Sequence, residues 1–336
     1  MAKIKVGIVA GGASSEHEVS CISASGVLAA IDRTKFEPIL IGITKSGQWV
    51  LPPVNLDLSV KGGALPTISD AHPHTSLNAI AVDLLFPVLH GTYGEDGAFQ
   101  AECEKAGVRY VGSGVQASAD GMDKWISKGI FTRHGLAVAQ GVIIHRESIS
   151  EDIAAAKKLT LPIFVKPASG GSSRGTSKVK NWDQLESAIN EAFAFDEKVL
   201  VESGIIGKEV ECAVLEVDGA PKASPVGEIR FVGGHEFYDF EAKYLDNSTQ
   251  LIIPAEIPAE AATNIQASAI AAFNALGCKG LARVDFFYSD KGEIIINEIN
   301  TMPGFTATSA FPKMWSAGGV NYTELITRLI EEALNN

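Results

Sequence analysis

The chain has 336 residues, of which 46% are hydrophobic and 20% are charged, which indicates an ordered globular protein with room for two or three domains. Its 28 lysines and arginines are outnumbered by 40 aspartates and glutamates, and the net charge of −12 argues against nucleic acid or an anionic membrane as the main partner. Its four cysteines lie far apart in the sequence, so we expect packed, reduced thiols rather than disulfides or a zinc site.

The start of the chain, MAKIKVGIVAGG, reads as a strand and a turn rather than as a signal peptide. The most apolar window, 79–89, is too short to cross a bilayer and contains Asp83. We therefore expect a cytoplasmic protein with no membrane partner.

The first part of the chain alternates predicted strands with predicted helices. Continuous apolar strands that alternate with helices favour a parallel sheet covered on both faces. We expect strands at 3–10, 37–44, 81–91 and 108–112, helices at 16–31 and 97–107, and an irregular segment at 52–78 that is rich in Pro, Gly, Ser and His.

After about residue 113 the pattern changes, and strands dominate from residue 208 onward. We expect helices at 116–134, 150–159, 181–195, 260–276 and 322–334, and strands at 161–167, 176–180, 198–203, 208–217, 222–230, 281–289 and 293–300. The predicted fold is α/β: a doubly wound N-terminal domain at 1–113, followed by two α+β lobes at 114–206 and 207–336.

Three loops carry motifs with competing explanations. In GGASSEHEVS, Ser15 and Glu18 fit a capping box, which does not account for Glu16 at the carboxyl end of a strand, where open α/β sheets bind ligands. HGTYGEDG, which begins at His90, reads first as a turn and a helix cap. GSGVQA at 112–117 imitates a dinucleotide fingerprint but lacks the acidic ribose partner, so we interpret it as a decoy.

The segment FVKPASGGSSRGTSKV is the most specific of these motifs. Lys166 ends an apolar strand, where its ammonium group is costly unless it meets an anion. The following glycines and serines can aim backbone N–H groups and hydroxyls at phosphates, and Arg174 lies among them. The pattern is not a Walker loop, and a flexible hairpin turn is the alternative, but the phosphate loop is favoured.

Two late strands end in polar residues. LARVDFFY places Arg283 and Asp285 on one face, and NEIN places Glu298 and Asn300 on one face. With regular alternation, Glu298 and Asn300 would lie on the same face as the apolar Ile294 and Ile296. Paired across a hairpin, the four polar residues would form one cluster, and two carboxylates with an amide oxygen suit Mg²⁺. An outward polar face with a salt bridge is the alternative.

Together these motifs resemble the ATP-grasp enzymes: a lysine-bearing strand and a Gly/Ser loop, then R-x-D on one strand and E-x-N on the next. The segments GGASSEHEVS, HGTYGEDG, GSGVQASADGMDK, VKPASGGSS, FYDFEAKY and NEINTMPGFT resemble D-alanine–D-alanine ligases, from about residue 4 to the last helix. The resemblance implies an ATP-dependent ligase that forms D-alanyl-D-alanine for peptidoglycan precursors through a D-alanyl phosphate. It also implies a homodimer.

The resemblance assigns roles to individual positions. Glu16 would hold the ammonium of the first D-alanine, linked by hydrogen bonds to Ser172 and Tyr244. The residues implied to contact ATP are Lys124, Lys166, Ser173 and Lys243 at the phosphates, and Glu202, Glu209, Phe237 and Phe287 at the adenosine. The residues implied around the reacting groups are Asp285, Glu298 and Asn300 as ligands of two Mg²⁺ (or Mn²⁺) ions, Arg283 and the Gly304 amide as an oxyanion site, Ser309 and Ala310 at the second carboxylate, and His90 near the substrates.

Alternatives stay open at this stage. A related ligase would take D-lactate or D-serine as acceptor, although Tyr244, which relatives that make D-alanyl-D-lactate lack, favours an amine. An ATP-binding module without turnover and a dinucleotide-binding enzyme are the other readings. The chain departs from the family at Arg174, where a small apolar residue is usual, and in its long 45–78 segment.

Overall fold

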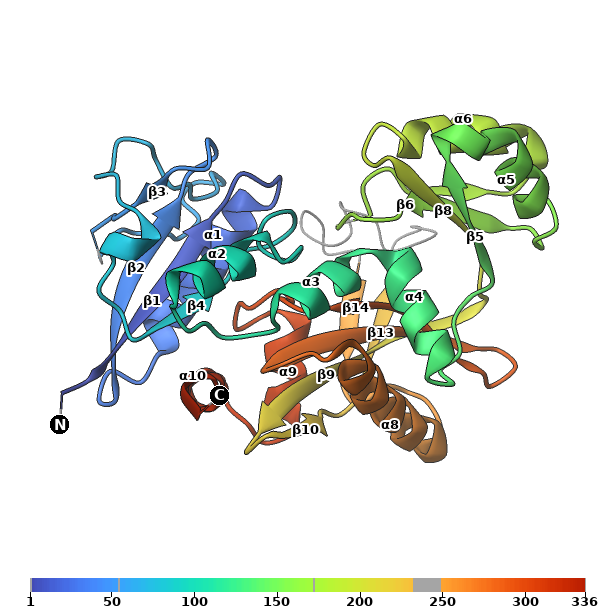
Figure 1. Ribbon diagram of the computed structural model, residues 1–336. Coiled ribbons are helices and arrows are strands. Elements are labelled where there is room, and N and C mark those ends of the chain that lie inside the picture. Colours follow the sequence, from blue (N-terminus) through green and yellow to red (C-terminus); the bar gives the residue numbers. More distant parts are fainter. Residues whose placement is uncertain (1, 54, 172, 232–248, 336) are drawn as a thin grey trace.

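The computed structural model describes residues 2–53, 55–171, 173–231 and 249–335. The described residues form three sheets, which Figure 1 shows as a blue N-terminal part, a green and yellow lobe, and an orange and red lobe. Among the described helices, none is long and apolar enough to span a membrane.

The first sheet has the order β3-β2-β1-β4 and is parallel except for its edge strand β3. Its strands are β1 (Ile4–Gly11), β2 (Phe36–Ile43), β3 (Trp49–Val50) and β4 (Leu84–Pro87), with the 3₁₀ turn η1 at Leu77–Ala79. Helix α1 (His17–Ala30) packs on the face that carries Ile8, and helix α2 (Ala98–Ala106) packs on the face that carries Val9. Helices on both faces confirm the doubly wound arrangement.

The second sheet is antiparallel, with the order β5-β8-β6-β7. Its strands are β5 (Gly141–His145), β6 (Ile163–Pro167), β7 (Ser177–Val179) and β8 (Lys198–Ser203). Helices α5 (Ile149–Ala156) and α6 (Leu185–Ala192), with the turns η2 (Arg146–Ser148) and η3 (Trp182–Gln184), complete this lobe. Its apolar cluster is separate from the others, so this lobe has a core of its own.

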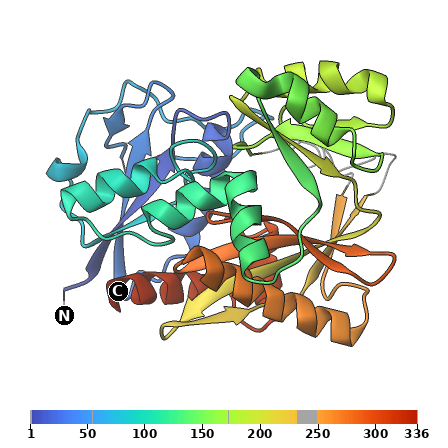
Figure 2. The ribbon, with the colours of Figure 1, turned by 45° about the vertical axis from the view of Figure 1, so that its right-hand side comes forward.

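The third sheet has the order β12-β11-β9-β13-β14, with β10 paired to β9. The strands are β9 (Gly207–Val217), β10 (Ala220–Ala223), β11 (Gly227–Phe231), β12 (Thr249–Ile252), β13 (Leu281–Ser289) and β14 (Ile294–Asn300). Helix α8 (Ala259–Leu276) covers one face. Helices α9 (Ala310–Ala317) and α10 (Tyr322–Asn335) pack on the other side, where one apolar cluster also includes Ile8 of β1, so the first and third sheets share a core. Figure 2 shows α10 beneath the blue sheet.

Four local predictions were wrong. The strand expected at 222–230 is two strands, β10 and β11, which are separated at 224–226 and pair with different parts of β9. The helix expected at 116–134 is two helices, α3 (Val115–Met122) and α4 (Lys124–Arg133), because Asp123 has extended backbone and its carboxylate accepts hydrogen bonds from the first N–H groups of α4. The capping box is absent: α1 begins at His17 after Glu16, with no side-chain cap among the described residues. The short strand expected at 108–112 is reduced to a single bridge between Tyr110 and Leu85.

Candidate active site

A β-bulge explains why polar residues follow an apolar strand. Asp285 pairs with Glu298, but the next residue, Phe286, pairs with Ile296, so Asn297 is an extra residue in β14. The expectation that Glu298 would share a face with Ile296 was therefore wrong. The bulge leaves Ile296 in the core under α8 and turns Glu298 toward the opposite, open face.

The bulge aligns the four predicted polar residues. Arg283 pairs with Asn300 and Asp285 with Glu298, so the predicted cross-strand pairing is confirmed. Arg283 donates to both oxygens of Asp285 at 2.7 Å, and its Nε lies 3.4 Å from Glu211 Oε1. All four side chains are partly buried and face cavities rather than bulk solvent.

The predicted metal ligands already contact protein donors. Lys124 Nζ lies 3.3 Å from Glu298 Oε2, and Asn300 Oδ1 accepts a hydrogen bond of 3.1 Å from Met302 N. The described residues contain no group of three or more His, Cys, Asp or Glu side chains placed to hold a metal. The candidate set is thus two carboxylates and an amide, which are oxygen ligands of the kind that Mg²⁺ takes together with waters and phosphate oxygens.

A second charged cluster is formed by residues of β6 and β8 in the second sheet and of helix α4. Lys166 of β6 forms an ion pair with Glu202 of β8, and its Nζ donates to Asn297 Oδ1 at 3.3 Å. Lys128 Nζ of α4 lies 3.0 Å from the other oxygen of Glu202. Burial alone would raise the pKa of Glu202, but the two lysines outweigh it and hold that pKa at about 2. Glu202 is therefore an anion at neutral pH.

The Gly/Ser loop between β6 and β7 closes over this region. Lys124 Nζ donates to Gly170 O at 2.6 Å, and Ser173 has a left-handed backbone with φ of 54°. A Cβ added to Gly171 would lie 3.3 Å from Glu16 Oε2, so the loop and the N-terminal domain meet there. Arg174 lies over the Phe195 ring, with Cζ 5.7 Å from its centre. Ser172 is outside the described residues.

The first cavity, of about 370 Å³, lies between the second and third sheets. It brings together the described residues that the resemblance assigns to ATP, namely Lys124, Lys166, Ser173, Glu202, Glu209 and Phe287, and it also contains Asp285 and Glu298. Phe237 and Lys243 lie outside the described residues. A cavity lined by lysines, glycines and an aromatic ring has the chemistry that a nucleotide requires.

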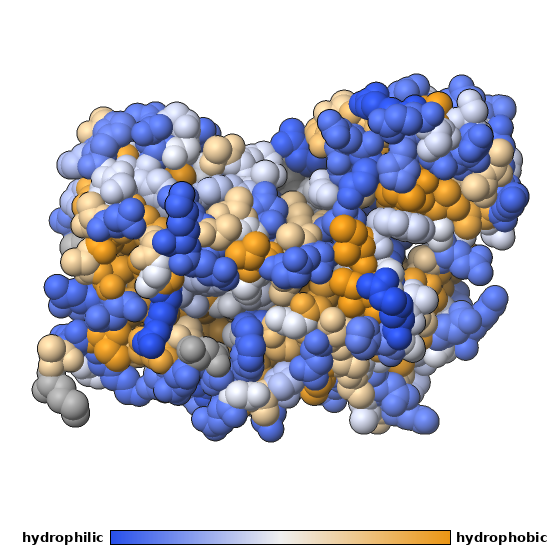
Figure 3. All heavy atoms as spheres, viewed as in Figure 1, coloured by the Kyte–Doolittle hydropathy of each residue, from blue (hydrophilic) through white to orange (hydrophobic). Residues whose placement is uncertain are grey.

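The second cavity, of about 590 Å³, lies toward the first sheet. It brings together the predicted substrate residues Glu16, His90, Arg283, Asn300, Gly304, Ser309 and Ala310. Six described residues line both cavities: Lys124, Gly170, Gly171, Glu211, Ile229 and Glu298. The cavities therefore meet at the glycine loop and at Glu211 and Glu298, and Figure 3 shows the surface hollowed between the N-terminal part and the second-sheet lobe.

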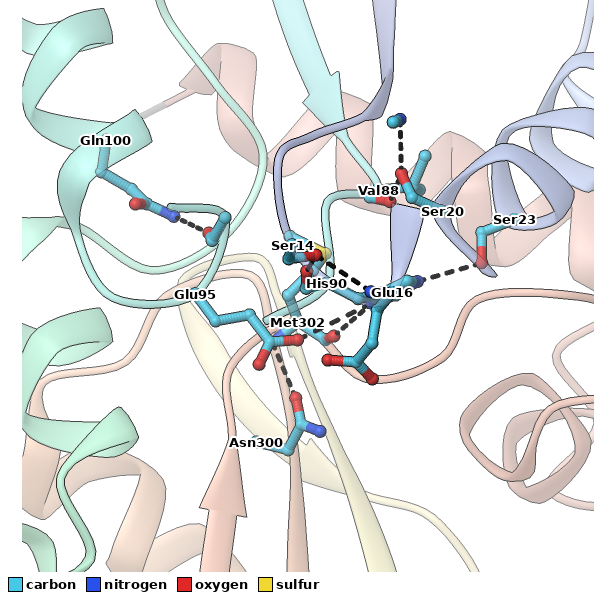
Figure 4. Close-up of polar contacts among 12 residues, drawn as sticks. Ser14, Glu16, Ser20, Ser23, Val88, His90, Glu95, Gln100, Asn300 and Met302 are labelled. Carbon is cyan, nitrogen blue, oxygen red and sulfur yellow. Dashed lines mark hydrogen bonds and ion pairs between the residues drawn. The ribbon is translucent and has the colours of Figure 1, made fainter. Parts of the chain in front are cut away.

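Figure 4 shows how Glu16 and His90 are held at this cavity. Ser14 Oγ donates to His90 O at 2.6 Å and accepts from Glu16 N at 3.2 Å. Glu16 is only 7% exposed, and its Oε2 would lie 2.8 Å from a Cβ on Gly91, whose φ of 75° also favours glycine. The carboxylate is thus positioned by two loops, those after β1 and β4. Tyr244, its other predicted partner, lies outside the described residues.

The His90 ring joins the N-terminal domain to the loop after β14. Its Nδ1 lies 3.1 Å from Met302 O and 3.6 Å from Glu95 Oε1, and its Nε2 lies 3.0 Å from Ser23 Oγ. Burial lowers the pKa of His90, but the hydrogen bond and charge of Glu95 outweigh burial, and the pKa is raised. The His90 ring therefore links the loop after β4 to the loop after β14 beside the second cavity.

The sequence interpretation missed three site residues. Glu95 was taken as part of a turn, although it faces His90 and lines the second cavity. Glu211 and Lys128 gave no local motif, because their partners Arg283 and Glu202 are distant in the chain. An acidic residue pointing inward on β9 was the available signal for Glu211, since a buried carboxylate requires a cation.

Two antiparallel sheets that enclose a cavity lined by lysines and glycines, with Asp285 and Glu298 paired in its wall, define an ATP-grasp fold. The model for the D-ala D-ala ligase N-terminus matches residues 5–113, and the model for the D-ala D-ala ligase C-terminus matches residues 130–331. The chain belongs to the D-alanine–D-alanine ligase family.

Relatives of known name agree with the family models. The D-alanine–D-alanine ligase of Pseudarthrobacter chlorophenolicus is 47% identical, over 99% of this chain and 94% of the relative. That of Mycolicibacterium smegmatis is 45% identical, over 99% of this chain and 96% of the relative.

Solved structures agree as well. The VanG D-Ala:D-Ser ligase from Enterococcus faecalis superposes with a TM-score of 0.85 at 37% identity, covering 99% of this chain and all of that one. The D-alanine–D-alanine ligase from Coxiella burnetii gives a TM-score of 0.85 at 35% identity, covering all of this chain and 95% of that one.

Proposed function

We propose that this chain joins two D-alanine molecules into D-alanyl-D-alanine, with conversion of ATP to ADP and phosphate, for peptidoglycan precursor synthesis. The observation that carries the proposal is the meeting of the two cavities, whose shared wall includes Lys124, Gly170 and Glu298. A phosphoryl group that leaves the first cavity at this wall enters the second beside Glu16 and Arg283.

The first cavity would hold ATP. Lys124, Lys166 and Lys243, with the Ser173 loop, would contact the phosphates, since cationic groups and loop N–H groups favour anions. Glu202 and Glu209 would face the adenosine, with Phe237 and Phe287 beside the base. Glu209 and Phe287 pair directly across β9 and β13, which supports their acting at one end of the ligand.

Asp285, Glu298 and Asn300 would hold two Mg²⁺ (or Mn²⁺) ions. When bound, these ions supply positive charge that neutralises the phosphates during transfer. Lys124 and Arg283, which contact the two carboxylates in the structure, would then turn toward the reacting anions.

The second cavity would hold both amino acids. Glu16 would bind the ammonium of the first D-alanine in a site that Ser172, Tyr244 and His90 complete. The carboxylate of the second D-alanine would lie at Ser309 and Ala310. Helix α9 begins there, and the N–H groups at a helix start favour an anion. Arg283 and the Gly304 N–H would stabilise the oxyanion of the tetrahedral centre.

The reaction then has two steps. A carboxylate oxygen of the first D-alanine attacks the γ-phosphorus of ATP, forming D-alanyl phosphate as the bond to ADP breaks. The amine of the second D-alanine, after losing a proton, attacks the carbonyl carbon, and inorganic phosphate leaves. Holding both reactants across the shared wall makes each step effectively intramolecular.

Each of three domains would have its own role. Domain 1–113 would bind the first amino acid, domain 114–206 would bind the nucleotide, and domain 207–336 would hold the metals and the catalytic groups. We propose a homodimer that acts in the cytoplasm, where ATP is available, on small molecules and not on nucleic acid.

The decisive experiment incubates the purified protein with ATP, Mg²⁺ and D-alanine, alone or with D-lactate or D-serine, and identifies products by mass spectrometry. We expect D-alanyl-D-alanine as the main product at neutral pH. A main product that contains D-lactate or D-serine would contradict the acceptor, and ATP binding without phosphate release would contradict the activity itself.

A further inference from the structure

Lys128 is a buried lysine that the proposed reaction does not use. It lies on α4, is 5% exposed, and its Nζ is 3.0 Å from Glu202 Oε2. Within the described part of the chain, neither of these two atoms has a hydrogen bond of good geometry. The contact is therefore one of charge rather than of a well-formed hydrogen bond.

The position of Lys128 relative to the first cavity is informative. Glu202 and Lys166 line that cavity, whereas Lys128 is not among the described residues that line either cavity. Lys128 thus lies behind Glu202, on the side away from the ligand space. It cannot reach a bound molecule directly, and any effect it has on binding must pass through Glu202.

A purely structural role explains Lys128 poorly. Taking an ammonium group out of water costs several kcal/mol, and an apolar residue of similar size fills such a site at lower cost. Burial also lowers the pKa of Lys128, and the attraction of Glu202 offsets this only in part. Folding therefore does not favour the charge at this position.

The net charge of the cluster around Glu202 points to a role for Lys128. Lys166 alone with Glu202 would form a neutral pair, whereas Lys128, Lys166 and Glu202 together carry one excess positive charge. We propose that Lys128 is a positioning residue: it engages one oxygen of Glu202, so that Lys166 keeps positive potential toward an anionic ligand in the first cavity. The ligand class is a nucleoside polyphosphate, and this inference rests on the proposed nucleotide site.

The test separates phosphate recognition from general damage. Binding of ADP and of adenosine, each with Mg²⁺, is measured by calorimetry or competition for the wild type, Lys128→Met and Lys128→Arg. We expect the Kd for ADP to rise about tenfold in Lys128→Met, since a unit charge is lost near the phosphates, while the Kd for adenosine, which meets Glu202 but carries no phosphate charge, rises much less. Lys128→Arg keeps the charge and should restore ADP binding.

Lys279→Met is the matched control. Lys279 Nζ lies 2.9 Å from Glu216 Oε1, a carboxylate that is 3% exposed, and neither residue is among the described ones that line a cavity. Its loss should leave binding of both ligands unchanged. Thermal unfolding of each variant checks the fold, and if Lys128→Met does not fold, Lys128→Gln, which keeps a polar group against Glu202, takes its place.

Two results would overturn the inference: unchanged ADP affinity in the neutral variant, or equal loss of ADP and adenosine affinity. Both leave the proposed function standing if the wild type still forms D-alanyl-D-alanine. Failure of the wild type to bind ADP would instead overturn the nucleotide site, and the role of Lys128 with it.

Discussion

Two charged clusters border the first cavity, and they are unbalanced in opposite directions. Around Glu202, two lysines face one carboxylate. Around Arg283, three carboxylates (Glu211, Asp285 and Glu298) face Arg283 and Lys124. The first cluster has excess positive charge and suits phosphates, and the second has excess negative charge and suits metal cations. The comparison shows how one cavity can take a metal–polyphosphate complex whose own charges are separated in the same way.

The largest expected effect comes from neutralising the centre of the cationic cluster. Glu202→Gln leaves two buried lysines without a counter-charge, so we expect the free energy of unfolding to fall by about 3 kcal/mol. Chemical denaturation measures this loss. Glu216→Gln, which removes the counter-charge of one half-exposed lysine, Lys279, and keeps an oxygen that can accept from Gly280 N, should cost less. Equal losses of unfolding free energy in the two variants would contradict the claim that Glu202 stabilises two buried lysines.

The acidic cluster should affect turnover rather than stability. Glu298→Gln removes a charge where the metal and the transferred phosphoryl group would meet, and we expect the rate of phosphate release with D-alanine to fall about 10²-fold or more. The unfolding temperature should change little. Glu293→Gln is the control: Glu293 lies in the turn before β14, accepts a hydrogen bond from Ser289 Oγ, and is not among the described residues that line either cavity. Turnover near the wild-type rate in Glu298→Gln would contradict the metal assignment.

The pH dependence of stability offers a third comparison. The pKa of Glu202 is held at about 2 against an ordinary value of 4.5, so its contribution to stability is present above about pH 4.5 and is lost as the pH falls toward 2. Denaturation midpoints between these pH values should therefore fall more steeply for the wild type than for Glu202→Gln. Parallel curves would mean that this carboxylate is not held as an anion by its lysines.

The smallest expected effect concerns the link between the clusters. Asn297, the bulge residue, accepts a hydrogen bond from Lys166 and so connects β14 with β6. Asn297→Ala should raise KM for ATP about threefold with little change in kcat, which is the size of one hydrogen bond. Asn274→Ala, on the exposed face of α8, should have no effect on KM. A change in kcat alone would place Asn297 in the chemistry instead of in nucleotide positioning.

Local pattern was sufficient for much of the site. Alternation along each strand predicted that Arg283, Asp285, Glu298 and Asn300 would form one cluster across a hairpin, and the register confirms the cluster, although the bulge at Asn297 is what aligns the pairs. A lysine at the end of an apolar strand before a glycine loop predicted the position of Lys166 at a cavity. These predictions succeeded because strand geometry and the cost of a buried charge act over a few residues.

Other features were not evident from the local pattern of residues. The bulge at Asn297 has no local signal, because the unbroken run IIINEIN is compatible with regular alternation. Asp123 divides a stretch with continuous helical pattern, since its carboxylate forms better hydrogen bonds as a cap than within a helix. Glu95 was interpreted as a turn residue, because nothing in the sequence of its loop shows that its side chain faces His90.

The amino-acid sequence by itself determined the fold class, many of the strands and helices, and the residue types available for a phosphate loop and for the acidic ends of β13 and β14. Periodicity and backbone preference set these features within each segment. Only the tertiary structure decided which face Glu298 takes and which cations surround Glu202, because α4, which packs with α8 and β14, meets β6 and β8 of the second sheet only in the folded chain. The balance of charge at the cavity is a property of that packing, since no single segment contains both the carboxylate and its two lysines.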